Sequence, residues 1–216
     1  MRDRAIVRQI AWDTALSGRP ASIFFGDKEV LQDLLTLYFT DYEPESCFVA
    51  ESGGRVIGYL IGCLDSRKLD RASLISITPG ILLKIILRGT ILNKKNRECL
   101  WRFIASFLKG EFICPDLYGP YPATMHINIA EDFRQAGAGT QLVSEFFKYL
   151  RKNSVRGVRL ATYSPDAGRF FEKQGFRLLF SKPRTYFSHV VEEKMRVYVY
   201  AEKLGDASGK RPLVFN

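Results

Sequence analysis

The chain has 216 residues, of which 46% are hydrophobic and 13% aromatic, enough apolar side chains for one packed domain over residues 1–216. This composition excludes an intrinsically disordered chain. The net charge of +9, from 32 basic and 23 acidic residues, indicates anionic partners, and it leaves phosphate-rich cofactors, nucleic acid and anionic lipid open.

The cysteines and histidines exclude a zinc site of the Cys/His type. The four cysteines are far apart and form no CxxC pair, and the chain has two histidines, His126 and His189. Free, mostly buried thiols fit a reducing compartment, so we expect a cytoplasmic protein. The N-terminal residues lack a following apolar region, so no signal peptide is expected. No stretch approaches the roughly 18 apolar residues that a membrane-spanning helix needs.

The first third of the chain predicts a strand, a helix and a hairpin. Residues 5–12 are expected to form a first strand. From Asp27, which is a suitable N-cap, apolar side chains recur at helical spacing. Strands at 47–50 and 55–64 then flank a turn at Gly53-Gly54. The second of these strands is nearly all apolar, which is typical of a central strand covered on both faces.

Residues 79–120 form an insertion that interrupts the alternation of strands and helices. Amphipathic helices are predicted at 81–87 and 100–108. Between 81 and 110 the chain carries seven basic residues and one acidic residue, Glu98, a net charge of +6. Three interpretations are open: a solvated helical pair that caps the sheet, a lid that selects an acidic or lipidic acceptor, and a face that rests on an anionic surface. Specific nucleic-acid binding ranks last, because no aromatic residues are interleaved for stacking.

The second half of the chain begins with a β-prone run at 125–129, followed by a short polar bend, the loop Arg134–Gly139 and a helix. Glycines let a backbone approach a phosphate, and the free amides of a first helical turn point at it. The loop therefore predicts an anion site, the alternative being an ordinary helix start. The elements expected after it are strands at 158–162, 176–180 and 196–203, a helix from Ser164 to Gln174, and a loose tail at about 205–216.

Two blocks resemble the GCN5-related N-acetyltransferases. Arg134, Gly137 and Gly139 fill the family's acetyl-CoA loop, Arg/Gln-x-x-Gly-x-Gly/Ala. Residues 164–176 resemble its Asn-x-x-Ala-x-x-Phe-Tyr-x-x-x-Gly-Phe block. The order of the elements matches over nearly the whole chain. The resemblance implies an α/β (α+β) fold with a mixed central sheet flanked by helices, and places the basic helical insertion between the third and fourth strands.

A narrower resemblance concerns the stretches around the insertion. Tyr42–Glu45, Phe48–Glu51 and Tyr121–Ile129 are similar to the acetyltransferase-like domain of O-GlcNAcases and to its bacterial stand-alone relatives. That subgroup usually carries His-Ile-Asp on the last of these stretches, where this chain has Asn128 in the third position.

The resemblance implies transfer of an acetyl group from acetyl-CoA to an amine of a small molecule or protein. Loop amides would anchor the pyrophosphate, Arg134 would add charge, and the strand ending at Ile129 would hold the thioester carbonyl and pair with pantetheine. The implied cofactor-binding residues are Ile127, Ile129, Arg134, Gln135, Ala136, Gly137, Ala138, Gly139, Thr140, Ser164 and Phe171.

The proton-transfer groups are less defined by the sequence. Phe171 stands where the family often has a catalytic Tyr, and Ser164 stands where it often has Asn, so Ser164 is equally well an N-cap. The catalytic candidates are His126 and Asn128, which share one face of a strand. His126 is suited to accept a proton near neutrality, and a buried core histidine is the alternative. A catalytically inactive relative that binds CoA or a partner is the second functional hypothesis, and a monomer or homodimer is expected.

Overall fold

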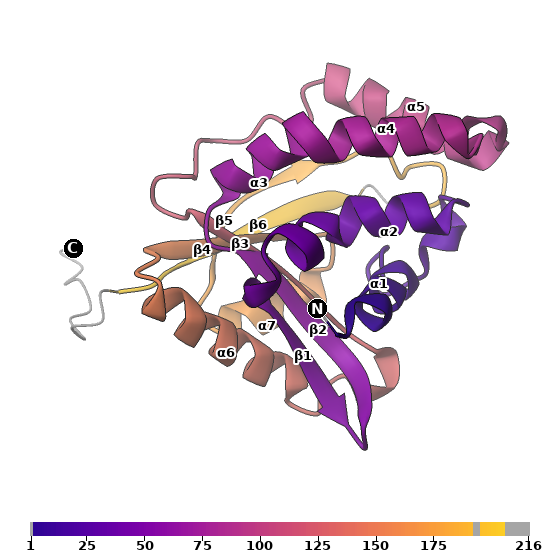
Figure 1. The fold of residues 1–216 in the computed structure, drawn as a ribbon. Helices are drawn as coiled ribbons and strands as arrows, with labels where there is room; N and C mark the ends of the chain where they lie inside the picture. Colours follow the sequence, from indigo (N-terminus) through magenta and orange to yellow (C-terminus); the bar gives the residue numbers. More distant parts are fainter. Residues whose placement is uncertain (1, 192–194, 206–216) are drawn as a thin grey trace.

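The computed structural model describes residues 2–191 and 195–205, so the predicted tail lies almost wholly outside the described residues. A six-stranded sheet in the order β1-β2-β3-β4-β6-β5 forms the centre (Figure 1). Neighbouring strands are antiparallel except β3 and β4, which are parallel. The strands are β1 (Cys47–Ser52), β2 (Arg55–Cys63), β3 (Ala123–Ile129), β4 (Gly157–Thr162), β5 (Arg177–Pro183) and β6 (Arg196–Lys203).

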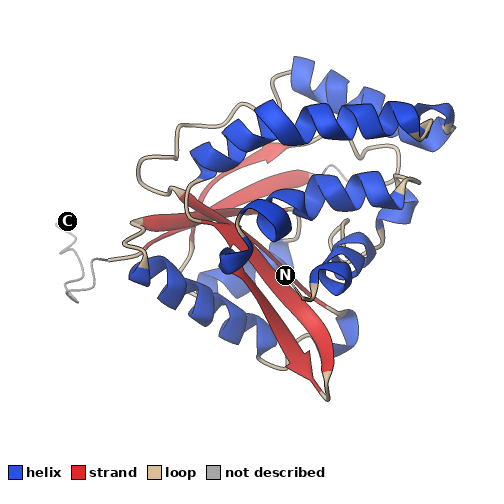
Figure 2. Cartoon of the chain, viewed as in Figure 1, coloured by secondary structure: helices blue, strands red, loops and turns tan. Residues whose placement is uncertain are grey.

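Helices cover both faces of this sheet (Figure 2). One face is covered by α6 and α7, which share a core with β3, β4 and β6. The other face is covered by α1, which packs on Tyr59 and Ile61 of β2, and by the layer that α2 forms with the insertion. The α-helices are α1 (Arg4–Asp13), α2 (Lys28–Leu37), α3 (Ser66–Ala72), α4 (Thr78–Leu87), α5 (Lys94–Leu108), α6 (Ala138–Lys152) and α7 (Pro165–Lys173).

The local signals for turns and caps are confirmed. Gly53 and Gly54 both have positive φ, +57° and +75°, in the turn between β1 and β2. Asp27 caps α2 by accepting a hydrogen bond from the amide of Val30 at 3.3 Å. Ser164 caps α7 in the same way, from Ala167 at 3.3 Å. Each signal was recognisable because it depends only on residues that are neighbours in the sequence.

The prediction of a first strand at residues 5–12 is wrong, because these residues belong to helix α1. Val7, Ile10 and Ala11 lie on one helical face and pack against β2. Arg8 is also buried, and it pairs with Asp33 of α2. The β-branched residues favour a strand locally, but the apolar face at helical spacing packs on the face of β2 that carries Tyr59 and Ile61, and this packing determines the structure.

The insertion starts earlier than predicted. It begins immediately after β2, with α3, and a π-helical segment (Ser73–Ile77) connects α3 to α4 without a break. The insertion lies between the second and third strands, a correction that follows from α1 being a helix. α3 is short and polar, so it carries no apolar periodicity, and the cap that starts it is Asp65, which accepts from the amide of Arg67.

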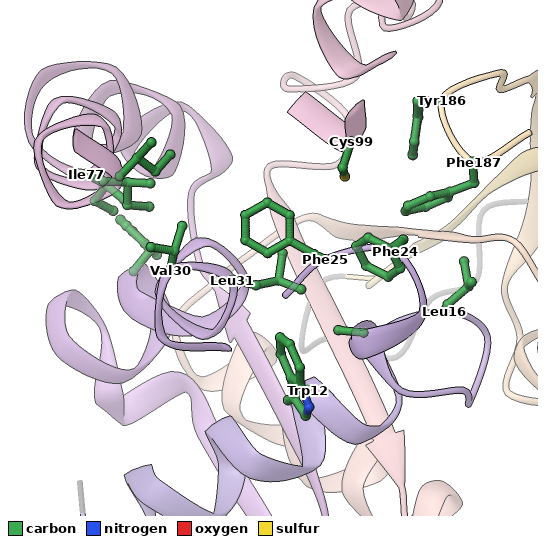
Figure 3. Packing of buried hydrophobic residues seen from close by; sticks show 14 of the residues in the cluster. Trp12, Leu16, Phe24, Phe25, Val30, Leu31, Ile77, Cys99, Tyr186 and Phe187 are labelled. Atoms are coloured by element: carbon green, nitrogen blue, oxygen red, sulfur yellow. The ribbon is translucent and has the colours of Figure 1, made fainter. Parts of the chain in front are cut away.

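The inner faces of α4 and α5 belong to the same hydrophobic core as α2 and the loop after α1. Figure 3 shows Ile77 and Cys99 entering this core from the insertion, opposite Leu31 and Phe25. No helix among the described residues is long and apolar enough to cross a membrane.

Candidate active site

An opening in the sheet between β3 and β4 lies at the centre of the site. The two strands pair only at Ala123 with Val158 and at Thr124 with Arg159. Beyond Thr124 they diverge, whereas β3 stays paired with β2 as far as Ile129. The edge of β3 from Met125 to Ile129 is therefore free of β4.

The backbone of β3 points groups that pair with no other strand of the described chain into this opening. The amide of Ala130 donates to the carbonyl of Ile57 at 2.8 Å, so this pair is hydrogen-bonded. Hydrogen-bonded pairs alternate along antiparallel strands, so the N–H and C=O groups of Ile127 and Ile129 point away from β2. They face the side from which β4 has diverged, where an extended ligand can pair with them as an added strand.

The loop before α6 presents a row of free amides. α6 follows Gly137, whose φ is +83°, and the first helical bond is donated by Gln141 to the Gly137 carbonyl at 3.1 Å. Between residues 135 and 140, no amide donates to a backbone carbonyl of the described chain. The positive end of the α6 dipole lies behind these amides, an arrangement that suits an anion, and anion binding by this loop remains a prediction.

Gly139 places this loop beside the opening. A Cβ atom there would lie 3.2 Å from Cζ of Phe170 and 3.9 Å from Cδ1 of Ile127. The first turn of α6 therefore packs directly against β3 and α7. The free amides and the unpaired strand edge thus belong to one continuous surface.

Arg134 lies across this loop in a way that the sequence did not indicate. Its Nε atom donates to the carbonyl of Ile129 at 3.3 Å. Its guanidinium group contacts the turn at Gly18, where a Cβ atom would lie 2.7 Å from Nη2. Arg134 thus connects the end of β3 to the turn after α1, and its predicted contact with a pyrophosphate remains a prediction.

On the opposite face of β3, His126 and Asn128 meet at a residue of the neighbouring strand. The hydroxyl of Tyr59 lies 3.2 Å from Nδ1 of His126, and Asn128 Nδ2 donates to the same hydroxyl at 3.0 Å. Tyr59 is fully buried beneath α1, while His126 is exposed. The predicted pair is therefore brought together, and the structure adds Tyr59 to it.

The direction of these hydrogen bonds defines the state of the imidazole. Since the Tyr59 hydroxyl accepts from Asn128, its own proton is directed at His126 Nδ1, which leaves the imidazole proton on Nε2. If the Asn128 amide turns by 180°, Oδ1 accepts from Tyr59, Nδ1–H of His126 donates to Tyr59, and Nε2 carries a free lone pair. The side chains support both directions because an amide presents a donor and an acceptor.

The surroundings favour the uncharged forms of both rings. Burial raises the pKa of Tyr59, so its hydroxyl keeps its proton. Desolvation by the surrounding protein lowers the pKa of His126 from 6.5 to about 4. Because His126 is exposed to solvent, we expect a smaller shift than in an enclosed site, in the same direction. The imidazole is therefore neutral at pH 7.

The two candidates from the second block lie away from His126. Ser164 Oγ is used as the α7 cap. Phe171 is only 5% exposed and packs against Phe176 and Tyr200 in the core. The position where the family often has a hydroxyl is thus a core position here, and Phe170, the preceding residue, lies against Gly139.

An open pocket of about 500 Å³ lies at the closed end of the opening. Its walls include Thr124, which is two residues before His126 and on the same face of β3. Arg159 of β4 also lines it, stacked over the ring of Tyr118 at 4.6 Å. Within the described chain, no three His, Cys, Asp or Glu side chains are grouped to hold a metal ion.

No protein-family model and no curated protein sequence matches the chain. Solved structures do. SsHAT has a TM-score of 0.69 at 21% identity and covers 95% of each chain. A polyamine N-acetyltransferase from Drosophila melanogaster has a TM-score of 0.57 at 13% identity, covering 94% of this chain and 96% of its own. A phosphinothricin acetyltransferase from Sinorhizobium meliloti in complex with AcCoA has a TM-score of 0.56 at 15% identity, covering 98% and 89%. The chain has the fold of the GCN5-related N-acetyltransferases.

Proposed function

We propose that the chain is an acetyl-CoA-dependent N-acetyltransferase that acts on an amine of a small molecule or protein. The observation that carries this proposal is the continuity between two sets of free backbone groups. The edge of β3 at Ile127 and Ile129 pairs with no strand of the described chain on the side of the opening, where the Ile129 carbonyl accepts only from Arg134 Nε. The amides from Gln135 to Thr140 are free at the start of α6.

These groups fit the two halves of acetyl-CoA. The extended pantetheine arm carries amides that can pair with a strand edge, and the pyrophosphate suits a helix N-terminus with glycine at Gly137 and Gly139. Ile127 and Ile129 would hold the arm, and the loop amides would hold the phosphates. When bound, acetyl-CoA would supply an activated acetyl group as a thioester.

His126 is the residue proposed to move a proton. As the acceptor nitrogen bonds to the acetyl carbon, the C–S bond breaks and CoA leaves as a thiolate. The amine loses a proton, which a neutral imidazole can take and which ends on the CoA thiol. With Oδ1 of Asn128 turned to Tyr59, Nε2 of His126 carries the free lone pair and Tyr59 holds Nδ1–H. Asn128 and Tyr59 would then orient the imidazole and stabilise its positive charge.

The acceptor is proposed to approach from the His126 face of the sheet. The open pocket beside Thr124 and Arg159 lies on this face, next to the opening, so an amine bound there would lie close to His126. The acceptor's identity depends on the insertion and on the loop over residues 112–118, which forms one wall of the pocket. Membership of the O-GlcNAcase-like subgroup is part of the same proposal, supported by the stretches at 42–51 and 121–129.

A catalytically inactive CoA-binding or partner-binding module is the second candidate. Two observations favour it. Phe171 supplies no hydroxyl and is buried, and the hydroxyls of Tyr163 and Tyr186 bond to each other, away from His126. Under this alternative the loop would still bind CoA, but no acetyl group would be transferred.

Thiol release from acetyl-CoA over a panel of amines tests the proposal. We expect release with at least one amine class, and His126→Ala should lower the rate by about 100-fold without changing acetyl-CoA affinity. The matched control is His189→Ala, which changes a histidine beside Arg102 of α5 and should keep the rate. Binding without release for every amine would favour the inactive module, and absence of binding would exclude both.

A further inference from the structure

The insertion exposes an unusual amount of apolar surface. Of the 18 large hydrophobic side chains that are exposed in the described chain, 13 lie between residues 74 and 113. Single exposed apolar residues are normal on a protein surface, but a concentration of this kind marks a contact site. We call the exposed apolar residues of α4 and α5 the outer surface of the insertion.

On α4 the apolar residues lie on two sides of the helix. Ile81 and Ile85 are buried in the core beneath α4. Leu82, Leu83 and Ile86 point outward and are 54%, 57% and 67% exposed. The inner face accounts for the packing of the helix, so the fold itself gives no reason for the outer apolar side chains.

On α5 the outward residues follow a regular stripe. Trp101, Ile104 and Leu108 are exposed at spacings of three and four residues, while Cys99 faces the core. Ile81 and Ile85 of α4 and Cys99 of α5 belong to the same core, so the exposed side chains of each helix lie on the side turned away from that core. Trp101 is 65% exposed, and tryptophan is favoured at the boundary between lipid headgroups and acyl chains.

The basic residues of the insertion divide into two groups. Lys84 and Arg88 form ion pairs with Asp27, Glu29 and Asp33 of α2, so their charge is neutralised within the protein. Arg102 pairs with Glu98.

Lys95 donates to the backbone carbonyl of Ser22 at 2.9 Å. The other three cations lie at the apolar stripe. Lys94 and Arg97 continue the Trp101 stripe toward the N-terminus of α5, again at a spacing of three and four residues, and Lys109 follows Leu108 at its other end. None of these three forms an ion pair with a carboxylate of the described chain. Both ends of the stripe are thus positively charged and free to meet an anionic partner.

We propose that the outer surface of the insertion binds an anionic lipid membrane. Apolar side chains including a tryptophan would enter the boundary region, and Lys94, Arg97 and Lys109 would lie at the level of the lipid phosphates. A second copy of the chain fits this surface less well. Two such surfaces would bring unpaired cations together, and Glu98, the carboxylate nearest the stripe, is already paired with Arg102.

Co-sedimentation of the full chain with vesicles tests this proposal. We expect binding to vesicles of phosphatidylcholine mixed with phosphatidylglycerol, weaker binding in high salt, and little binding to phosphatidylcholine alone. Lys94→Glu combined with Arg97→Glu should lower the partition coefficient at least tenfold, and so should Trp101→Glu.

Matched controls separate a surface effect from a loss of folding. Lys152→Glu on α6 and Leu178→Glu on the edge strand β5 change a cation and a large apolar side chain at exposed sites elsewhere, and both should bind as the wild type does. Circular dichroism of each variant should show the wild-type helix content, because every substituted side chain is exposed.

Three outcomes would overturn the proposal. They are failure to bind the mixed vesicles, equal binding to vesicles without phosphatidylglycerol, and unchanged binding of the Trp101 and Lys94/Arg97 variants. Sedimentation velocity gives a further check. A dimer that Trp101→Glu dissociates, without any vesicle binding, would assign the surface to a second copy. None of these results depends on acetyl-CoA binding or turnover.

Discussion

The Tyr59 hydroxyl lies 3.2 Å from Nδ1 of His126, and this contact links a fully buried side chain to an exposed one. Asn128 extends it by donating to the same hydroxyl at 3.0 Å. The three residues form a chain of hydrogen bonds across β2 and β3, at the point where β3 has lost its pairing with β4. The direction of these hydrogen bonds decides whether Nε2 of His126 carries a proton or a free lone pair.

Tyr59→Phe should reduce turnover about tenfold with little change in acetyl-CoA affinity, because the imidazole loses the hydrogen bond that orients it. The phenyl ring keeps the packing beneath α1, so the free energy of unfolding should fall by only about 1 kcal/mol. The pH profile of kcat gives the decisive readout, since its acidic limb should move. An unchanged profile and rate would show that Tyr59 serves packing alone.

Asn128→Asp should leave only one set of donor and acceptor roles for Tyr59 and His126. A carboxylate accepts but does not donate, so Tyr59 must donate to it and His126 must keep its proton on Nδ1. Nε2 is then a permanent acceptor, and turnover should be equal to or higher than that of the wild type. Asn128→Leu, the control without hydrogen-bonding groups, should lower turnover. If both variants of Asn128 have equally low turnover, the direction in which Tyr59 donates to residue 128 is not the one that supports catalysis.

His126 should titrate below the ordinary histidine range. Desolvation lowers its pKa in the folded protein, so the unfolded chain binds more protons and stability falls as the pH drops from 6.5 toward 4. Above pH 6.5 the imidazole is neutral in both the folded and the unfolded chain, so this loss of stability is absent. NMR titration of the imidazole protons measures the pKa directly, and His189→Gln assigns the two signals. A value at or above 6.5 would contradict the predicted direction.

Gly137→Ala should weaken CoA binding at least tenfold. Gly137 has a φ of +83°, which an L-residue adopts at a cost of about 1 kcal/mol, and relaxation would turn the loop amides away from the phosphates. Gly54→Ala is a matched control, because Gly54 has a φ of +75° and open space around it and belongs to the turn between β1 and β2. Calorimetric titration should show a loss of CoA affinity for Gly137→Ala but not for Gly54→Ala. Equal affinities would exclude the loop as the anion site.

Asp33→Asn should destabilise the fold by about 3–5 kcal/mol, because it leaves the buried Arg8 guanidinium without its counter-ion. Asp33 also pairs with Lys84 at 2.5 Å, so the change loosens the contact between α2 and α4. Glu29→Gln, which removes an exposed partner of the same lysine, should leave stability almost unchanged. Urea unfolding of both variants measures the difference, and equal midpoints would show that the buried pair is dispensable.

Features that depend on neighbours in the sequence were predictable, and features that depend on distant packing were not. The Gly53-Gly54 turn, the Asp27 and Ser164 caps and the glycines before α6 all follow from local chemistry. The prediction for residues 5–12 is wrong because their apolar helical face packs against β2, which lies far away in the sequence. The divergence of β3 and β4 is an absence of pairing, which no local pattern encodes.

The same limit applies to the site. His126 and Asn128 could be placed on one face because strand side chains alternate. Tyr59 could not be chosen among ten tyrosines, because its position opposite Asn128 depends on the register of β2 and β3. The contact of Arg134 with Gly18 likewise joins segments that only the folded chain brings together.

Titration of the full chain with acetyl-CoA tests the proposed cofactor site most directly, with thermal unfolding as the second readout. We predict saturable binding at one site per chain and, at about 100 times the dissociation constant, stabilisation by about 2.7 kcal/mol. Binding should weaken in Gly137→Ala and persist in His126→Ala. Absence of binding heat together with an unchanged unfolding temperature, at millimolar acetyl-CoA and at millimolar CoA, would contradict the assignment of the β3 edge and the α6 loop as a cofactor site.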